Sequence, residues 1–219
     1  MQKQRGPLTY PHFLRVHYIL FHEFYPWAGS DRYQLGVGRI VTKGQGVQFE
    51  LSENCQQAVE WGLNDGNDKE RMRRRPGGIM GAFAWGHPFL DGNGRTMLLV
   101  HAELCHRAGF SIDWIASKKH EYLDALTHEL VHPQSQRLNS YFAGLMVESR
   151  PREDWIGHFK AIPGLAGGAD EDEHISYSED DMQAIARYEE IRKNREAKVL
   201  PKQGEKPDSG KIRRRRMGF

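Results

Sequence analysis

Apolar side chains recur at helical spacing along most of the first 150 residues. The first series has members three or four residues apart, which places them on one helical face: Phe13, Val16, Leu20 and Phe24. Pro26 and Gly29 end this predicted helix, because neither residue suits a helix interior. Similar patterns predict helices over 53–63, 79–85, 95–108, 118–130 and 137–146, with 64–68 and 73–78 as loops.

Residues 38–49 follow a different pattern. Two short β-prone runs flank a Gly-Gln-Gly tip at 44–46, which predicts a β-hairpin. The sequence therefore predicts an all-α fold, a helical bundle with one β-hairpin, whose core ends near Ser149. A further, highly charged helix is predicted around 179–195.

Composition narrows the class of protein. The chain has 219 residues, of which 38% are hydrophobic and 27% charged. No apolar run approaches the roughly 18–20 residues of a membrane span, so we expect no transmembrane segment. The first residues lack the apolar stretch of a signal peptide. Cys55 and Cys105 form neither a disulfide framework nor a paired metal motif, and together these features predict a cytoplasmic protein.

Charge is distributed unevenly along the chain. Residues 191–219 hold eleven basic and three acidic side chains, a net +8, whereas residues 1–190 hold 20 basic and 26 acidic ones, a net −6. Residues 149–219 are therefore predicted to form a charged C-terminal extension, disordered over 201–210. Its Arg213–Arg216 run is typical of a solubilising tail, of a segment that binds nucleic acid or another acidic surface, or of an export signal.

The candidate chemistry is concentrated in residues 87–95, His-Pro-Phe-Leu-Asp-Gly-Asn-Gly-Arg. Two glycines around an asparagine can turn successive N–H groups toward an anion, and a helix that starts near Arg95 adds its positive N-terminal end. The Arg95 guanidinium suits phosphate oxygens. Asp91 would repel phosphate unless a cation bridged them, which points to Mg²⁺. His87 titrates near neutrality and is the candidate general base.

This segment closely resembles the signature of Fic-domain proteins, HxFx(D/E)GNGRxxR. The stretch Leu20–Gly29, which contains Tyr-Pro-Trp-Ala-Gly, also resembles that family, and the order of helix, turn, hairpin and signature agrees. The resemblance covers residues 8–148, which are thus expected to form a Fic domain.

The resemblance implies a protein adenylyltransferase that moves AMP from ATP to a Tyr, Ser or Thr hydroxyl of a target protein and releases pyrophosphate. Carried over, His87 would deprotonate the acceptor and Asp91 would hold Mg²⁺. The phosphates would be bound by four consecutive residues, Gly92, Asn93, Gly94 and Arg95. The hairpin would be a flap that pairs with the target backbone through Val41, Thr42, Lys43, Gly44, Gln45, Gly46 and Val47.

The chain departs from the signature at position 98, where Leu98 replaces the second arginine that would contact the distal phosphates. Transfer of UMP, phosphocholine or phosphate therefore stays open as an alternative, as does a non-catalytic interaction protein with a basic, nucleic-acid-binding tail.

Ser149 and Glu153 have the spacing of the family's inhibitory motif, but Pro151 disfavours the helix that such a motif needs, so we treat the match as chance. We expect instead either a separate antitoxin-like inhibitor or no such regulation at all. Export as an effector rests on family analogy alone.

Overall fold

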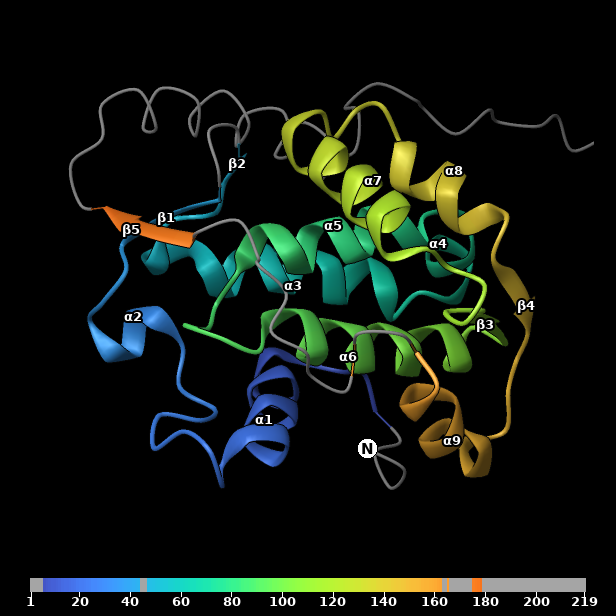
Figure 1. The fold of residues 1–219 in the computed structure, drawn as a ribbon, viewed down its shortest axis with the longest axis horizontal. Coiled ribbons are helices and arrows are strands. Elements are labelled where there is room, and N and C mark those ends of the chain that lie inside the picture. The colour runs from blue at the N-terminus through green and yellow to red at the C-terminus, as the bar shows by residue number, and fades with distance from the viewer. Residues whose placement is uncertain (1–5, 44–46, 163–164, 166–174, 179–219) are drawn as a thin grey trace, which may run out of the picture.

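The computed structural model describes residues 6–43, 47–162, 165 and 175–178. Its helices, shown in Figure 1, are α1 (Tyr10–Phe21), α2 (Arg32–Leu35), α3 (Cys55–Gly66), α4 (Lys69–Arg74), α5 (Pro76–Gly86), α6 (Asn93–Arg107), α7 (Lys119–Val131), α8 (Arg137–Ala143) and α9 (Trp155–Lys160). Its strands are β1 (Ile40–Lys43), β2 (Val47–Gln48), β3 (Phe110–Ile112), β4 (Met146–Glu148) and β5 (Ile175–Ser178).

Helix α5 forms the centre of the bundle. It contacts α3, α6, α7 and α8, and Figure 1 shows α7 and α8 on one side of it and α6 on the other. A helix that is enclosed on every side is apolar all round. Helix α5 fits this rule, since its buried residues include Ile79, Met80, Phe83 and Trp85. The prediction of a buried helix at 79–85 is confirmed, and the helix extends over Pro76–Gly86.

The predicted hairpin is present. Strands β1 and β2 pair antiparallel, with Thr42 opposite Gln48 and Lys43 opposite Val47, while the tip at 44–46 lies outside the described residues. Strand β5 pairs with the other edge of β1, so the sheet order is β2-β1-β5 (Figure 1). Strands β3 and β4 form a second, two-stranded sheet.

Several predicted helix boundaries are wrong. Helix α1 ends at Phe21, so Phe24 is not on its apolar face and is 75% exposed. Helix α3 continues through the first three residues of the loop predicted at 64–68, and Gly66 packs so closely there that a Cβ would lie 2.6 Å from Leu104 Cδ1. The loop predicted at 73–78 shrinks to Arg75, between α4 and α5.

The helix predicted over 137–146 ends earlier, at Ala143. Met146–Glu148 instead form β4, which pairs with β3 directly after α6. Beyond the predicted end of the core, Phe159 of α9 packs against the hydrophobic cluster. The pairing partner and the packing surface of these segments lie far away in sequence, which local patterns do not reveal.

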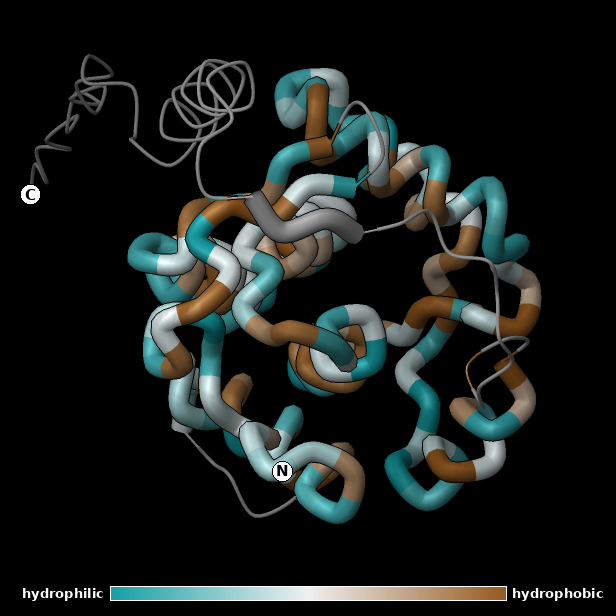
Figure 2. Tube along the Cα trace, turned by 60° about the vertical axis from the view of Figure 1, so that its left-hand side comes forward, coloured by the Kyte–Doolittle hydropathy of each residue, from teal (hydrophilic) through white to brown (hydrophobic). Residues whose placement is uncertain are grey.

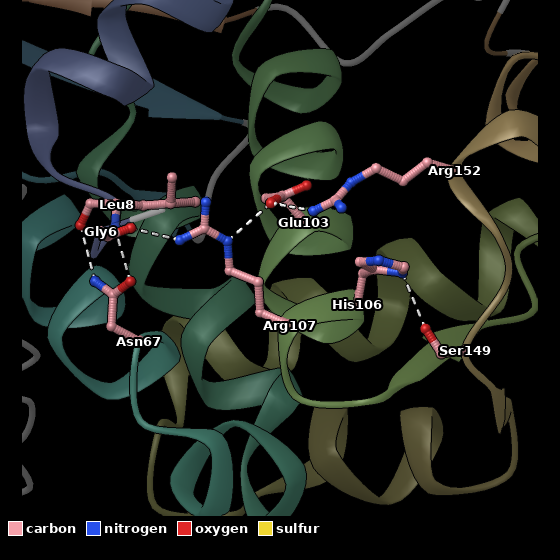
Figure 3. A network of polar contacts seen from close by, with 8 residues as sticks. All are labelled: Gly6, Leu8, Asn67, Glu103, His106, Arg107, Ser149 and Arg152. Carbon is pink, nitrogen blue, oxygen red and sulfur yellow. Dashed lines mark hydrogen bonds and ion pairs between the residues drawn. The ribbon is translucent and has the colours of Figure 1, made fainter. Parts of the chain in front are cut away.

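A polar network fixes α6 to the rest of the chain (Figure 3). The buried Glu103 carboxylate accepts hydrogen bonds from Arg107 at 2.8 Å and from Arg152 at 2.6 Å. Arg107 also donates to the Gly6 carbonyl oxygen, while His106 contacts Ser149 Oγ at 2.9 Å. The helix that carries the signature at its N-terminus is therefore anchored near its C-terminus to both the start of the chain and the segment after β4.

This anchoring bears on the chance match at Ser149 and Glu153. Ser149 contacts His106, eleven residues beyond Arg95 on α6, which corresponds to roughly 16 Å along the helix axis. The segment thus lies at the end of α6 opposite the signature loop, as expected if the inhibitory motif is coincidental.

The predicted helix at 179–195, the disorder at 201–210 and the basic run at 213–216 lie outside the described residues. Among the residues that are described, no helix is long and apolar enough to cross a membrane. Figure 2 accordingly shows hydrophobic and hydrophilic residues interspersed along the chain.

Candidate active site

The loop between α5 and α6 lies at the same end of the bundle as α2 and β1 (Figure 1). His87 is the first residue after α5 and adopts the left-handed conformation, with φ 38° and ψ 54°. A non-glycine residue in this region of φ/ψ space is uncommon and is held there by its surroundings. Its imidazole stacks on the Phe49 ring, with 3.9 Å between centroids, and is 8% exposed.

The His87 side chain keeps an uncommitted ring nitrogen within the described part of the structure. Its Nε2 atom is buried and has no hydrogen-bond partner among the described residues. Burial, together with the smaller effect of the positive charges of Arg32 and Lys43, lowers the pKa of His87 to about 3. The imidazole is therefore neutral at pH 7 and able to accept a proton.

Arg32 fixes the backbone around His87. It is completely buried, and its guanidinium donates to the carbonyl oxygens of His87 (2.8 Å) and Glu50 (2.8 Å). The same guanidinium also donates to the Gly38 and Gly86 carbonyl oxygens. One side chain thus joins the signature loop to both ends of the hairpin segment.

Asp91 lies in a polar cluster at the mouth of the loop. Its Oδ1 accepts the Gly92 N–H at 2.6 Å, and its Oδ2 accepts the Tyr25 hydroxyl proton. Arg95 Nη2 lies 3.6 Å from the same Oδ2. The hydrogen bond to Asp91 is the main reason why the pKa of Tyr25 is raised.

His17 holds the backbone of Asp91 through a hydrogen bond. The Gly29 N–H donates to His17 Nδ1 at 2.9 Å, so Nε2 carries the proton and donates to the Asp91 carbonyl oxygen at 3.0 Å. The imidazole is buried and stacks on Phe89, 3.7 Å away between centroids. Burial lowers the pKa of His17, which keeps this ring neutral.

Asn93 closes the loop with its side chain. Its Oδ1 accepts the Phe89 N–H at 2.9 Å and its Nδ2 donates to the Phe89 carbonyl oxygen at 2.7 Å. Helix α6 begins at Asn93, and its first intrahelical bond runs from the Thr96 N–H to the Gly92 carbonyl oxygen. The N–H groups of Asn93, Gly94 and Arg95 precede that bond, have no partner within the described segments, and can donate to an anion.

A cavity of about 480 Å³ opens beside these groups. His87, Asp91 and the residues 92–95 line one side of it, and Lys43, Val47 and Phe49 line another. The remaining wall is mainly apolar and includes Leu98, Trp114, Tyr122, Leu123, Leu126, Leu130, Ile162 and Leu165. The site thus combines a neutral base, a helix N-terminus and an apolar surface.

Residues 7–105 match the Fic/DOC family. This chain is therefore similar to the Fic/DOC family over this segment, which is a little under half of its length. The match begins just before α1 and ends within α6, so it contains the hairpin, Arg32 and the whole signature loop.

Two curated proteins are similar to this chain. The protein adenylyltransferase VbhT of Bartonella schoenbuchensis is 29% identical over 121 residues, which cover 53% of this chain and 25% of VbhT. The probable protein adenylyltransferase y4lH of Sinorhizobium fredii is 27% identical over 131 residues, which cover 55% of this chain and 65% of y4lH. The chain therefore matches less than two thirds of either relative.

Solved structures show the same fold. A crystal structure of BepC from Bartonella tribocorum with bound AMPPNP has a TM-score of 0.54 and 20% identity, covering 67% of this chain and 80% of that one. The N-terminal Fic domain of Bep8 from Bartonella sp. 1-1C has a TM-score of 0.56 and 15% identity, covering 69% and 79%. The predicted Fic fold, helical with a β-hairpin, is confirmed.

The structure brings the predicted residues of the Fic/DOC signature together around one cavity, with the described part of the hairpin beside them. Three residues that hold the signature loop in place were not predicted from the sequence: Arg32, His17 and Tyr25. Tyr25 lies in the stretch that resembles the family, so that resemblance contained a signal. Arg32 and His17 act on carbonyl oxygens from distant segments, and no local motif indicates such contacts.

Asp91 is suited to share a divalent cation rather than to hold one alone. Among the described residues, no group of three His, Cys, Asp or Glu side chains could form a metal site. Mg²⁺ is commonly bound by one or two carboxylates together with substrate phosphates. The donor set therefore fits a cation that arrives with a nucleotide.

Alanine substitutions at the two glycines of the signature should affect stability differently. Gly92 has φ +77°, and a Cβ there would lie 2.4 Å from a Phe21 ring atom, whereas a Cβ on Gly94 would meet nothing within 4 Å. We expect Gly92→Ala to lower the free energy of unfolding by about 2–4 kcal/mol, because backbone strain adds to overpacking. Denaturant titration measures this loss.

Gly94→Ala is the matched variant. Its stability should be unchanged or up to about 1 kcal/mol higher, because alanine favours a helix over glycine. Gly94 lines the cavity beside the helix N-terminus, so the new methyl group should still weaken nucleotide binding. Equal destabilisation by the two substitutions would contradict this prediction.

Proposed function

We propose that the chain is a nucleotidyltransferase that moves AMP from ATP to a Tyr, Ser or Thr hydroxyl of a protein. The observation that carries this proposal is that His87, whose buried Nε2 has no hydrogen-bond partner among the described residues, lines the same cavity as the N-terminus of α6. A neutral base beside an anion-binding helix end is what transfer to a hydroxyl requires.

The proposed reaction follows from these positions. The acceptor hydroxyl gives its proton to His87 Nε2, and its oxygen forms a bond to the α-phosphorus of ATP. The bond from that phosphorus to the bridging oxygen breaks, and pyrophosphate leaves. The free N–H groups at the start of α6 and the Arg95 guanidinium stabilise the phosphate oxygens, since such a displacement depends mainly on positioning and charge.

Asp91 would hold Mg²⁺, which supplies positive charge to the phosphate oxygens when bound. Tyr25 and Arg95 fix the Asp91 carboxylate in place before the nucleotide arrives. His17 holds the backbone of the same residue. The apolar wall of the cavity, which includes Tyr122 and Leu126, offers a surface for the adenine ring of the nucleotide.

The relatives support this proposal. Two similar proteins are named as an adenylyltransferase and a probable adenylyltransferase, and the BepC structure contains AMPPNP, an ATP analogue. Protein targets would dock along the described part of the hairpin, whose residues Lys43 and Val47 line the cavity. A cytoplasmic location, an antitoxin-like inhibitor and a nucleic-acid partner for the tail stay predictions.

Leu98 favours a second donor class. It is 7% exposed and lines the cavity one helical turn after Arg95, where a second arginine would face the distal phosphates. An apolar group there favours a donor with less charge beyond the bond that breaks, such as CDP-choline, which transfers phosphocholine and releases CMP.

Labelled donors distinguish these reactions. The full chain is incubated with Mg²⁺, a cell lysate and either α-labelled ATP, γ-labelled ATP, α-labelled UTP or labelled CDP-choline. We expect protein labelling from α-labelled ATP alone. Label from the γ position beyond that of lysate without the chain would indicate a kinase, label from UTP would indicate UMP transfer, and label from CDP-choline would identify the second donor class. No label from any donor would overturn the proposed transferase activity.

A further inference from the structure

Strand β1 ends in a lysine at the rim of the candidate active site. Lys43 is the last residue of β1, which lies between β2 and β5 in the sheet (Figure 1). Its backbone stands opposite Val47 on one side and Ile175 on the other, so a strand is paired with each edge of β1 at this position. The place of Lys43 is therefore fixed by the sheet.

The Lys43 side chain belongs to the face of the hairpin that borders the cavity. Residues directly opposite each other in an antiparallel pair share a face, and both Lys43 and its partner Val47 line the cavity. Phe49, two residues after Val47, also lines it and stacks on the His87 imidazole. The positive charge of Lys43 is close enough to that imidazole to lower its pKa. This face of the hairpin is thus the one directed at the candidate base.

The ammonium group of Lys43 has no partner within the described part of the chain. The side chain is partly buried, yet no hydrogen bond or ion pair joins it to another described residue. A partly buried cation loses some of its hydration, which is unfavourable unless an anion compensates for the loss. An anion bound in the cavity would supply that compensation.

The charges around the cavity single out Lys43 as the cation that is least offset. Of the described residues that line it, the charged ones are Lys43, Asp91, Arg95 and Lys119. Arg95 Nη2 lies 3.6 Å from Asp91 Oδ2, so these two opposite charges partly cancel. Lys119 is exposed at the first residue of α7, and Leu98 brings no charge one helical turn after Arg95. The phosphate chain of a nucleotide carries several negative charges, which a further cation would balance.

We propose that Lys43 binds the phosphate chain of the nucleotide donor from the hairpin wall of the cavity. This inference rests on the proposed function. Because Lys43 and His87 border the same part of the cavity, the ammonium group acts near the phosphorus that the acceptor oxygen attacks. Lysine binds phosphate oxygens as a point charge, and positive charge at that place stabilises the transition state. The hairpin thus contacts the donor through a side chain, in addition to any contact with a protein target.

The test measures ATP binding rather than transfer. Isothermal titration calorimetry uses the full chain in a His87→Ala background, with Mg²⁺ and no acceptor protein, so that ATP is not consumed. Lys43→Met removes the charge but keeps an unbranched side chain, and it should weaken ATP binding by at least about 10-fold, because a hydrogen bond to a charged group is lost. Lys43→Arg keeps the charge and should stay within a few-fold of the parent.

The matched control is Lys69→Met, which removes an exposed lysine of α4 and should bind ATP as the parent does. Thermal unfolding checks that each variant is folded. Ionic strength separates charge from shape, because salt screens a charge contact. The ratio of the parent affinity to the Lys43→Met affinity should therefore shrink as salt is raised from about 0.1 M to about 0.5 M.

Equal ATP affinity of the parent and Lys43→Met would overturn the inference while the proposed function stands. So would a ratio that salt does not change, or an equal loss in Lys43→Arg, since the side chain would then act through its shape. Unchanged ATP binding with weaker labelling of lysate proteins, measured with His87 intact, would assign Lys43 to the protein target instead. No ATP binding by any of the chains would overturn both this inference and the proposed function.

Discussion

His87→Ala should abolish transfer of the labelled nucleotide while the protein stays folded. The imidazole is the buried, unpartnered nitrogen base in the cavity, and a positioned general base contributes typically about 10²–10⁴ in rate. We therefore expect kcat to fall by at least about 10²-fold. Labelling kinetics with α-labelled ATP measure this loss, and thermal unfolding checks the fold.

The control for this variant is His132→Ala, which removes an exposed imidazole at the end of α7. Its transfer rate should equal that of the wild type. A second variant, His87→Gln, fills part of the same volume and should be equally inactive, which separates loss of the base from loss of packing against Phe49. A wild-type transfer rate in either His87 variant would contradict the assignment of His87 as the general base.

The pH profile gives an independent readout of the same residue. In the free protein, burial lowers the pKa of His87 to about 3, so the neutral form persists as the pH falls through 6.5. Nucleotide phosphates bring negative charge beside the ring and should raise the pKa in the complex. The value that governs kcat should therefore lie above the one that governs kcat/KM.

Much of the candidate site could be predicted from the sequence because its chemistry is local. The residues from His87 to Arg95 are neighbours in the chain, so their types and spacing already indicate a base, a cation ligand and a phosphate loop. The structure shows in addition which polar atoms of the loop are used in hydrogen bonds within the loop itself. The Asn93 side chain closes the loop on Phe89, and the Gly92 N–H is taken by Asp91.

The remainder depends on contacts between distant segments. The sequence at 64–66 has turn propensity, yet packing of Gly66 against Leu104 carries α3 through it. Strand β4 forms because β3 lies beside it. Arg32 reads as an ordinary charged residue after Asp31, and only the assembled fold surrounds it with carbonyl oxygens.

Arg32→Met should destabilise the protein and impair transfer at the same time. The substitution keeps an unbranched, buried chain but leaves the His87 and Glu50 carbonyl oxygens without the donor that satisfies them. A buried acceptor that loses its partner costs about 1–3 kcal/mol, so we expect a loss of at least about 3 kcal/mol. This corresponds to a melting temperature roughly 6–12 °C lower.

Arg39→Met is the matched control on the same segment. Arg39 is half exposed, and its ion pair with Glu53, at 3.0 Å, is a surface contact worth about 0–1 kcal/mol. The melting temperature of this variant should stay within a few degrees of the wild type. A similar loss in both variants would mean that Arg32 has no special role in stability.

Arg32→Lys separates positioning from charge. Lysine keeps the positive charge that holds the His87 imidazole neutral, but it cannot reproduce a planar fork that donates to several carbonyl oxygens. If Arg32 positions His87, kcat should fall in Arg32→Lys while KM for ATP changes little, because the guanidinium donates to the His87 carbonyl oxygen whereas the proposed phosphate-binding groups are those at the start of α6. A change confined to KM would instead assign Arg32 to nucleotide binding. An unchanged kcat in a folded variant would show that other contacts hold the left-handed conformation of His87.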